Sequence, residues 1–311
     1  MSLNQHNGPY VSIIIPHYNN KETIFRTLES LKFQSFENWE CIIVDDSSCE
    51  SSLNELAKHI VDDLRFKLIL RKNYSTISGA NICRNLGVCN SKGNWLIFVD
   101  ADDTLLENCL QERVNEINES QLCNLFIFKT AVVDNNGGYK WEFKCKNIAQ
   151  KHLLLSLYTH SIPWHTMSVV WQREFLLKIG GWNIQYERLQ DVELNIRAIL
   201  NNPIIKVFDN SFDSLYWQQS MNESKKRYAR FGFCRLIKDY YNKLIEFDTD
   251  LDFSSKISLA TENMLNFHIQ SYLVSAEKDP HWENLYLHTL EAVSIPKSEI
   301  KIVKKAFLTK V

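Results

Sequence analysis

Three aspartates in one short stretch are the first residues whose types and spacing suggest chemistry. Asp100, Asp102 and Asp103 directly follow the apolar run 95–99. Carboxylates this close repel one another, and a bound divalent cation would offset the repulsion. The stretch alone is typical of two unrelated sites. One contains an aspartate nucleophile that attacks phosphorus, and the other is a D-x-D motif that holds a sugar nucleotide through a metal ion.

Two earlier polar clusters also follow apolar, β-branched runs. Ligands bind beyond the carboxyl ends of the strands in an open parallel sheet, so clusters in these positions are expected to meet at one edge. The first cluster is Pro16, His17, Tyr18 and Asn19, and the second is Asp45 and Asp46.

The elements that must position these clusters alternate in type over the first hundred residues. Short apolar runs predict strands, and apolar residues at helical spacing predict helices between them. The expected strands are 10–16, 39–46, 65–71 and 94–100, and the expected helices are 21–35, 50–63 and 79–93. This alternation indicates an α/β fold with a largely parallel sheet covered by helices on both faces. Gly93 is expected to end the third helix in a left-handed conformation.

After residue 105 the pattern is mixed and then helical. Strands are expected on either side of Asn135-Asn136-Gly137, which is a hairpin signal. A strand and a short helix are expected in 165–182, where Gly180-Gly181 ends the helix. The other expected elements are helices at 105–120, 147–160 and 189–200, a strand at 204–209, and helices only from 221.

Composition restricts the classes of protein further. The chain has 311 residues and a formal charge of −2, which does not suggest a nucleic-acid binder. Eight cysteines without a C-x-x-C pair indicate reduced thiols in a cytosolic protein. There is no signal-peptide pattern, and no run approaches the ~20 apolar residues of a membrane helix. Residues 1–9 are expected to form a disordered leader.

The phosphohydrolase alternative explains only the aspartate stretch. In the haloacid dehalogenase type, Asp100 would be the nucleophile and Asp102 the acid–base. That motif ends the first strand of its core, whereas here three strand–helix units precede it. The P-loop and dinucleotide-binding fingerprints are absent as well.

Four motifs taken together resemble glycosyltransferase family 2, the inverting enzymes of GT-A fold. They are "VSIIIPHYNN", "ECIIVDDSS", "GANICRNLGVCNSKGNWLIFVDADD" and "IGGWN" followed by "LQDVELNIRA". The resemblance runs from Tyr10 to Ser224. It implies a Rossmann-like, mostly parallel central sheet with flanking helices and a C-terminal helical extension. The expected domains are a GT-A domain at 10–220, with a nucleotide-binding half at 10–104 and an acceptor-binding half at 105–220, and a helical region at 221–311.

The resemblance also implies a donor site. Asp46 would accept a hydrogen bond from N3–H of the base, which favours uracil or thymine because cytosine has no such donor. The expected donor is a UDP-sugar in preference to a dTDP-sugar. Pro16 and Tyr18 would pack against the base, and Arg84 would lie near the nucleotide or brace the aspartates. The other donor-binding candidates are His17, Asn19, Asp45, Asn85, Asp100 and Ala101.

A divalent cation, Mn²⁺ or Mg²⁺, is implied because hard oxygen ligands suit these ions. Asp102 is the main candidate for direct metal contact, with Asp100 nearer the ribose or sugar. Asp103 is either a second ligand or an orienting neighbour. Many relatives have a histidine that completes the metal shell where this chain has Gln219, which offers an amide oxygen or leaves the position to water.

The general base is expected at Asp191, in the position of the aspartate of the family's E-D pair. Gln190 replaces the usual glutamate of that pair, and Glu193 is a weaker candidate for the base. Trp164, His165 and Trp182 could line the acceptor pocket, since sugars stack on aromatic rings. Loss of turnover through Gln190 and Gln219 would leave a sugar-nucleotide-binding protein instead of an enzyme.

Basic and aromatic residues alternate near the start of the C-terminal helices, in 223–243, and lysines surround Ile300, Val303 and Phe307. Such helices either lie on an anionic membrane surface or form a solvated cap or dimer contact. The expected location is the cytoplasm, with peripheral contact at the inner face of the membrane as an addition. The resemblance places the function in bacterial surface polysaccharide or glycoconjugate synthesis, with a saccharide or lipid-linked saccharide as acceptor. No motif indicates an oligomeric state.

Overall fold

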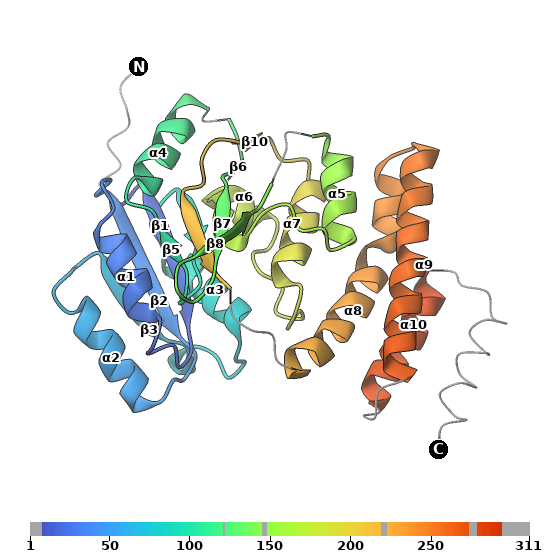
Figure 1. Cartoon of the computed structure of the whole chain (residues 1–311), viewed down its shortest axis with the longest axis horizontal. Coiled ribbons are helices and arrows are strands. Elements are labelled where there is room, and N and C mark those ends of the chain that lie inside the picture. Colours follow the sequence, from blue (N-terminus) through green and yellow to red (C-terminus); the bar gives the residue numbers. More distant parts are fainter. Residues whose placement is uncertain (1–7, 121, 145–147, 219–222, 274–278, 294–311) are drawn as a thin grey trace. The chain divides into compact units, whose positions relative to one another are not determined.

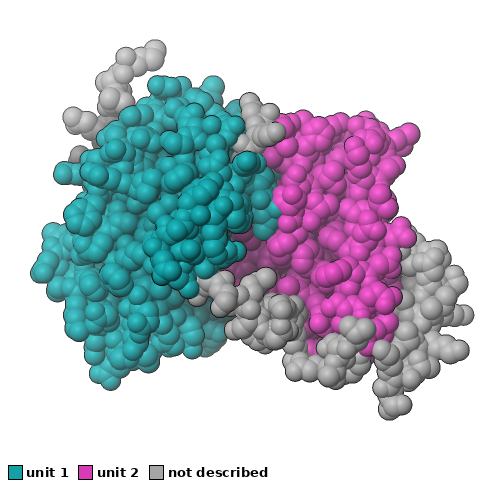
Figure 2. Space-filling view, viewed as in Figure 1, with its two compact units in different colours: residues 1–147, 162–184, 197–219 teal, residues 148–161, 185–196, 220–311 magenta. Residues whose placement is uncertain are grey.

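The computed structural model describes residues 8–120, 122–144, 148–218, 223–273 and 279–293, without the side chains of 223–228. These residues group into two compact units (Figures 1 and 2). Unit 1 contains 1–147, 162–184 and 197–219, and unit 2 contains 148–161, 185–196 and 220–311. Within the described part of the chain, no helix is both long and apolar enough to cross a bilayer.

Unit 1 is built on a sheet with seven strands among the described residues. Its order is β10-β6-β9-β4-β1-β2-β3, and β9 is antiparallel to both of its neighbours. The other pairings are parallel, so the predicted mostly parallel α/β sheet is confirmed. The strands are β1 (Val11–His17), β2 (Trp39–Asp45), β3 (Phe66–Leu70), β4 (Trp95–Phe98), β6 (Leu125–Ile127), β9 (Val169–Gln172) and β10 (Ile205–Val207).

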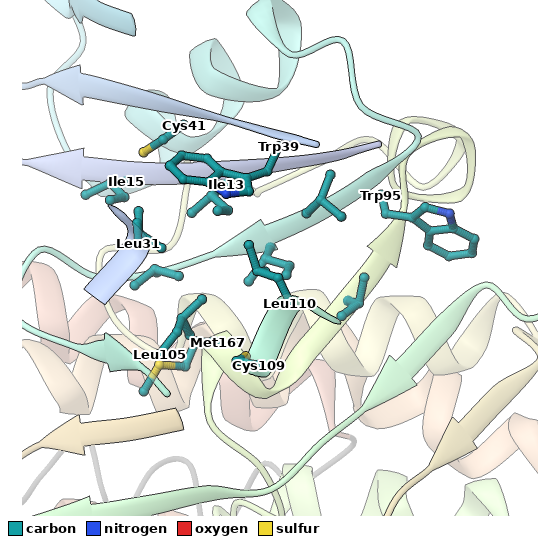
Figure 3. Close-up of a cluster of buried hydrophobic side chains, with 14 of the residues drawn as sticks. Ile13, Ile15, Leu31, Trp39, Cys41, Trp95, Leu105, Cys109, Leu110 and Met167 are labelled. Atoms are coloured by element: carbon teal, nitrogen blue, oxygen red, sulfur yellow. The ribbon is translucent and has the colours of Figure 1, made fainter. Parts of the chain in front are cut away.

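Helices cover both faces of this sheet because its central strands are apolar on both sides. On one face, Ile13, Ile15 and Cys41 pack with side chains from three helices in a single buried cluster (Figure 3). On the other face, Ile42 and Val44 pack with Cys83. The first face carries α1 (Ile24–Lys32), α2 (Glu50–Ile60) and α4 (Cys109–Glu119), and the second carries α3 (Ala80–Asn90).

The end of α3 corrects one sequence expectation. The helix ends at Asn90, and Gly93 does not have the positive φ that a left-handed C-cap requires. A Cβ on Gly93 would lie 2.6 Å from the backbone nitrogen of Ser12, so glycine is needed there for close approach to β1.

A second sheet in unit 1 has the order β5-β11-β7-β8. The predicted hairpin is confirmed, because β7 and β8 pair antiparallel around Asn135-Asn136-Gly137 and Gly137 has a φ of 82°. The single strand expected before this turn is instead two strands, β6 and β7, which belong to different sheets. The second sheet consists of β5 (Thr104–Leu105), β7 (Thr130–Val133), β8 (Tyr139–Glu142) and β11 (Ser214–Trp217).

Unit 2 is helical. In it α8 packs on α9 and α10, and the Tyr158 hydroxyl pairs with Thr261 Oγ1 at 2.8 Å to join α5 to α9. Asp279 caps α10 and Pro280 is the first residue of that helix, an ordinary start signal. The helices are α5 (Gln150–Tyr158), α8 (Glu223–Phe247), α9 (Leu251–Leu273) and α10 (Pro280–Ala292).

The short helix α6 (Arg173–Lys178) lies in unit 1, and the division between the units falls within α7 (Gln190–Leu200). Segments 148–161 and 185–196 therefore group with the C-terminal helices, although the sequence analysis placed them in the acceptor-binding half. Domain boundaries at 104 and 220 remain a proposal. Gln219, most of the expected leader, the side chains of 223–228 and the segment 294–311 lie outside the described residues.

Candidate functional site

Three predicted polar clusters meet at the carboxyl edge of the main sheet. The loops after β1, β2 and β4 surround a cavity of about 260 Å³. Tyr18 lies at this cavity with 59% of its surface exposed, so its ring is not part of the core. The lining residues are Pro16, His17, Tyr18, Asn20, Asp46, Ala80, Cys83, Arg84, Asp100, Ala101 and Asp102.

Asp46 is held in place by two segments. Its Oδ1 accepts a hydrogen bond from Arg71 Nε at 2.6 Å, and its Oδ2 accepts one from the backbone nitrogen of Gly79 at 2.8 Å. Arg71 also donates to Ser47 Oγ and to the carbonyl oxygen of Ser75, and only 7% of its surface is exposed. Arg71 was not among the predicted site residues, although a basic residue at the end of an apolar run was a usable signal.

Asp45 has a different role from its neighbour. It pairs with His17 in the register of β1 and β2, and its Oδ1 lies 2.9 Å from His17 Nδ1. Its Oδ2 accepts a hydrogen bond from the backbone nitrogen of Ser48. Burial alone would raise the pKa of Asp45, but the hydrogen bonds from His17 and Ser48 outweigh burial and lower it. The pair thus fixes the loop that carries Asp46.

Asn19 fixes the same loop. With a φ of 54° it takes a left-handed conformation, and its Oδ1 accepts from the backbone nitrogen of Cys49 at 2.9 Å. Its own backbone nitrogen donates to Ser48 Oγ. Asp45 and Asn19 were both expected to bind the donor, and the structure shows both in contact with the loop that carries Asp46.

Arg84 braces the aspartate stretch, which is one of its two expected roles. Its Nη2 donates to Asp100 Oδ1 at 2.7 Å, and its guanidinium lies 4.4 Å from the ring centroid of Trp182. Burial would raise the pKa of Asp100, but the Arg84 charge opposes this and the net pKa is lowered. Asp100 is therefore ionised and oriented.

Asn85 does not lie on the cavity as expected. Its side-chain nitrogen donates to the carbonyl oxygen of Trp182, and its Oδ1 accepts from the Trp182 backbone nitrogen. Trp182 itself is 3% exposed and packs edge-on against Phe98, and Trp164 is 1% exposed. Neither tryptophan presents a ring face to an acceptor, because both serve as core residues.

The remaining aspartates face different surroundings. Asp102 lies at the cavity, and its carbonyl oxygen accepts from Arg26 Nη2 at 2.8 Å. Asp103 is fully buried; its Oδ1 accepts from the backbone nitrogen of Trp217, and its Oδ2 lies 4.0 Å from His165 Nδ1. Burial, followed by the charges of Asp102 and Asp100, raises the pKa of Asp103 well above its ordinary value.

A group able to hold a cation is formed by Asp100, Asp103 and His165. Each residue offers one ligand atom, and these atoms all lie within 4.8 Å of one another. His165 was expected to contact the acceptor, but it lies beside Asp103 with its ring stacked on Tyr216 at 4.5 Å. Two carboxylates and an imidazole form a donor set that fits a divalent transition-metal ion.

The candidate base lies in unit 2. Asp191 is the second residue of α7 and is partly exposed, whereas Glu193 is fully buried and accepts a hydrogen bond from the Tyr240 hydroxyl at 2.5 Å. Only Asp191 of the two can reach a solvent-borne substrate. Gln190 donates to the carbonyl oxygen of Glu187, so its amide helps to fix the turn before the helix.

Residues 12–173 match the family model described as glycosyl transferase family 2. The chain belongs to this family. The match includes all of the strand–helix units that the phosphohydrolase alternative left unexplained.

Related proteins are also described as glycosyltransferases. An uncharacterised glycosyltransferase of Haemophilus influenzae is 27% identical over 82% of this chain and 85% of its own length. The amylovoran biosynthesis glycosyltransferase AmsB of Erwinia amylovora is 30% identical over 60% of this chain and 63% of its own. A Campylobacter jejuni GalNAc(5)-diNAcBac-PP-undecaprenol beta-1,3-glucosyltransferase is 28% identical over 45% and 44%.

Solved structures share the fold. S. aureus TarS 1–349 in complex with UDP-GlcNAc has a TM-score of 0.69 at 19% identity, covering 94% of this chain and 83% of that one. The mannosyltransferase PcManGT of Pyrobaculum calidifontis, in complex with GDP-Man and Mn²⁺, has a TM-score of 0.55 at 13% identity, covering 98% and 82%. The expected GT-A fold with a helical C-terminal region is thereby confirmed.

Proposed function

We propose that this member of glycosyl transferase family 2 is an inverting, metal-dependent enzyme that uses a UDP-sugar. Its acceptor would be a hydroxyl group of a saccharide or lipid-linked saccharide, in the synthesis of a bacterial surface polysaccharide or glycoconjugate. The observation that carries the proposal is one cavity lined by the braced Asp46 and by Asp100 and Asp102. Such a cavity can take a base at one carboxylate and a metal-bound diphosphate at the others.

Base recognition rests on Asp46. Each of its oxygens accepts one hydrogen bond within the protein and has a second lone pair. That lone pair can accept N3–H of uracil or thymine, whereas N3 of cytosine carries no hydrogen. The exposed ring of Tyr18 and the neighbouring Pro16 offer a packing surface for the base. The complex of TarS with UDP-GlcNAc supports uracil over thymine.

The cation is proposed to be Mn²⁺ or Mg²⁺, held by Asp102 and Asp100. Their fit is supported by the oxygen chemistry of the stretch and by the buried Asp103 Oδ2, which has no hydrogen-bond partner among the described residues. A bound cation supplies Lewis-acid stabilisation of the diphosphate leaving group. Arg84 keeps Asp100 ionised and oriented, and the hydrogen bond from Arg26 fixes the backbone at Asp102.

Asp191 is proposed as the general base that removes the proton from the acceptor hydroxyl. Asp191 is the second residue of α7 and is partly exposed, so its carboxylate can meet a hydroxyl group that arrives from solvent. Attack by that hydroxyl opposite the leaving diphosphate inverts the anomeric centre. The carbonyl of Glu187 and the amide of Gln190 hold the preceding turn, so Gln190 is proposed to orient Asp191.

The site of action is proposed to be the cytoplasm, with contact at the inner membrane face through the basic C-terminal helices. The undecaprenol-linked acceptor in the name of the Campylobacter relative supports a lipid-linked acceptor. Release of the protein from washed membranes by high salt would be expected. Retention on the membrane at every salt concentration would contradict electrostatic attachment.

A thermal-shift panel of nucleotide sugars with Mn²⁺ tests the donor assignment. UDP-sugars should raise the unfolding temperature, since a ligand that binds the folded state stabilises it by mass action. Asp102→Ala should remove the metal-dependent part of this shift, and Asp63→Ala, which breaks a surface ion pair with Arg65, serves as control. A larger shift with CDP-sugars or GDP-sugars would contradict the proposal.

Asp191→Asn tests the base. The variant should bind UDP like the wild type but release UDP from the donor at least about 100-fold more slowly with a bacterial envelope extract as acceptor. Glu187→Gln, an exposed residue in the same segment, is the control and should retain activity. Unchanged transfer by Asp191→Asn would refute the assignment. Binding without transfer in the wild type would instead indicate a sugar-nucleotide-binding protein.

A further inference from the structure

The cluster of Asp100, Asp103 and His165 joins the aspartate stretch to the segment before β9. Asp103 Oδ2 and His165 Nδ1 are 4.0 Å apart, too far for a hydrogen bond. The three ligand atoms lie within 4.8 Å of one another. Atoms bound to one Mn²⁺ or Mg²⁺ at about 2.1 Å cannot be more than about 4.2 Å apart, so only small movements would bring all three to one ion.

The buried side chain of Asp103 has one oxygen that can bind a cation. The side chain is fully buried, and Oδ2 has no hydrogen-bond partner among the residues that the structure describes. Asp100 and Asp102 add negative charge around it. A carboxylate buried in this way is ionised only where a cation compensates its charge. The unsatisfied oxygen is also the atom of Asp103 that approaches His165.

Each of the three side chains is already oriented by a neighbour. Asp103 Oδ1 is bound by the backbone nitrogen of Trp217, and Asp100 Oδ1 by Arg84. The His165 ring stacks on Tyr216 with an interplanar angle of 26°. Ligands oriented by surrounding contacts are typical of metal sites in proteins.

We propose that Asp103 and His165 join Asp100 of the D-x-D pair as ligands of the same divalent cation, and that the imidazole of His165 makes the site prefer Mn²⁺ over Mg²⁺. Mg²⁺ binds oxygen almost exclusively, whereas first-row transition metals accept imidazole nitrogen. The inference rests on the proposed function, because Asp100 also lines the donor cavity. In many relatives the histidine ligand stands at the position of Gln219. Here the proposed imidazole ligand is His165, which belongs to a different segment of the chain.

Electron paramagnetic resonance of Mn²⁺ without nucleotide tests the proposal on the full chain. The wild type should bind Mn²⁺ and show a nitrogen coupling in the spin-echo spectrum. His165→Ala and Asp103→Asn should weaken binding at least about tenfold, with circular dichroism verifying the fold. His59→Ala is the matched control, because that histidine pairs with Glu55 of α2 and packs near Phe25 of α1, outside the cluster.

His165→Asn provides the sharper comparison. It replaces a nitrogen ligand by an amide oxygen, so the nitrogen coupling should vanish and Mg²⁺ should displace Mn²⁺ at a lower concentration than in the wild type. Retained coupling, or wild-type Mn²⁺ affinity in His165→Ala, would overturn the proposal. Loss of Mn²⁺ binding in Asp102→Ala, with wild-type affinity kept by both Asp103→Asn and His165→Ala, would limit the ion to the D-x-D pair and would also overturn the proposal. Failure of UDP to bind the wild type would count against the proposed function only, since the Mn²⁺ measurement contains no nucleotide.

Discussion

At the residue scale, adjacent aspartates differ in role because their partners differ. Asp45 is buried against His17, while Asp46 lines the cavity and accepts hydrogen bonds from Arg71 and Gly79. The family resemblance assigned base binding to Asp46, but the sequence did not show what Asp45 contacts. The register of the strands explains this difference. His17 and Asp45 are paired residues of β1 and β2. Side chains of consecutive residues point in opposite directions along a strand, so Asp46 points away from His17.

Replacing Arg71 should weaken donor binding more than it weakens the fold. Arg71→Ala removes the charged hydrogen bond that orients Asp46, worth about 1.5–3 kcal/mol. The Kd for UDP, measured by calorimetry, should rise roughly 10- to 100-fold. Arg65→Ala is the control, since that arginine pairs with Asp63 away from the cavity. Equal increases in the Kd for UDP in the two variants would mean that Arg71 acts only through its positive charge and not through its contact with Asp46.

The residues that sequence reasoning misplaced have a common physical cause. Trp164, Trp182 and Asn85 are of types that bind sugars and nucleotides, but composition does not reveal burial or backbone partners. Asp46 and Asp100 were anticipated at the edge of the sheet because their position follows from strand ends, whereas Arg84, which lies in α3, was anticipated from the family resemblance. Contacts between distant segments, such as His165 with Asp103, carry no local signal.

At the scale of elements, the parallel part of the sheet was predictable and the second sheet was not. Residues 10–100 contain long apolar runs with clear helical segments between them, and each was found close to its expected place. Strands β5 and β11 have two and four residues, too short for a periodic pattern. The run 122–134 continues through two sheets, so its hydrophobicity did not indicate the break between β6 and β7.

The turn after α6 should be sensitive to a single methyl group. Gly181 has a φ of 65°, and a Cβ there would lie 2.7 Å from Asn85 Oδ1, the atom that holds Trp182. Gly181→Ala should therefore lower the free energy of unfolding by about 1–3 kcal/mol. Denaturant titration would measure it, with Gly8→Ala as the control because nothing lies within 4 Å of a Cβ at Gly8. Equal stability of both variants would contradict this role of the turn.

At the scale of the whole molecule, the two units should respond differently to pH. In unit 2, burial and then the Arg230 charge lower the pKa of His268 to about 4. A histidine with a depressed folded pKa stabilises the fold above its unfolded pKa near 6.5, and this stability is lost as pH falls toward 4. Phe233 and Phe267 pack around the ring, so a neutral aromatic replacement fits the site.

His268→Phe should reduce the loss in free energy of unfolding that unit 2 shows as the pH falls. Between pH 6.5 and 4 the wild type should lose up to about 1.4 kcal/mol per pH unit from this group, and the variant should not. Calorimetric scans across that range would measure the difference. His288→Gln, an exposed histidine on α10, is the control and should keep the wild-type slope. Parallel curves for His268→Phe and the wild type would refute the assignment.

The loop that Asn19 holds also contains an exposed thiol that reagents can reach. Cys49 is exposed, and hydrogen bonding, first from Ser51, lowers its pKa, so a larger fraction of it is thiolate at neutral pH. Burial raises the pKa of Cys41, Cys83, Cys109 and Cys234, which keeps those thiols protonated. A fluorescent maleimide should therefore label Cys49 ahead of these four. Asn19 links Cys49 to the end of β1, so the fluorescence of the dye should change when a ligand enters the cavity.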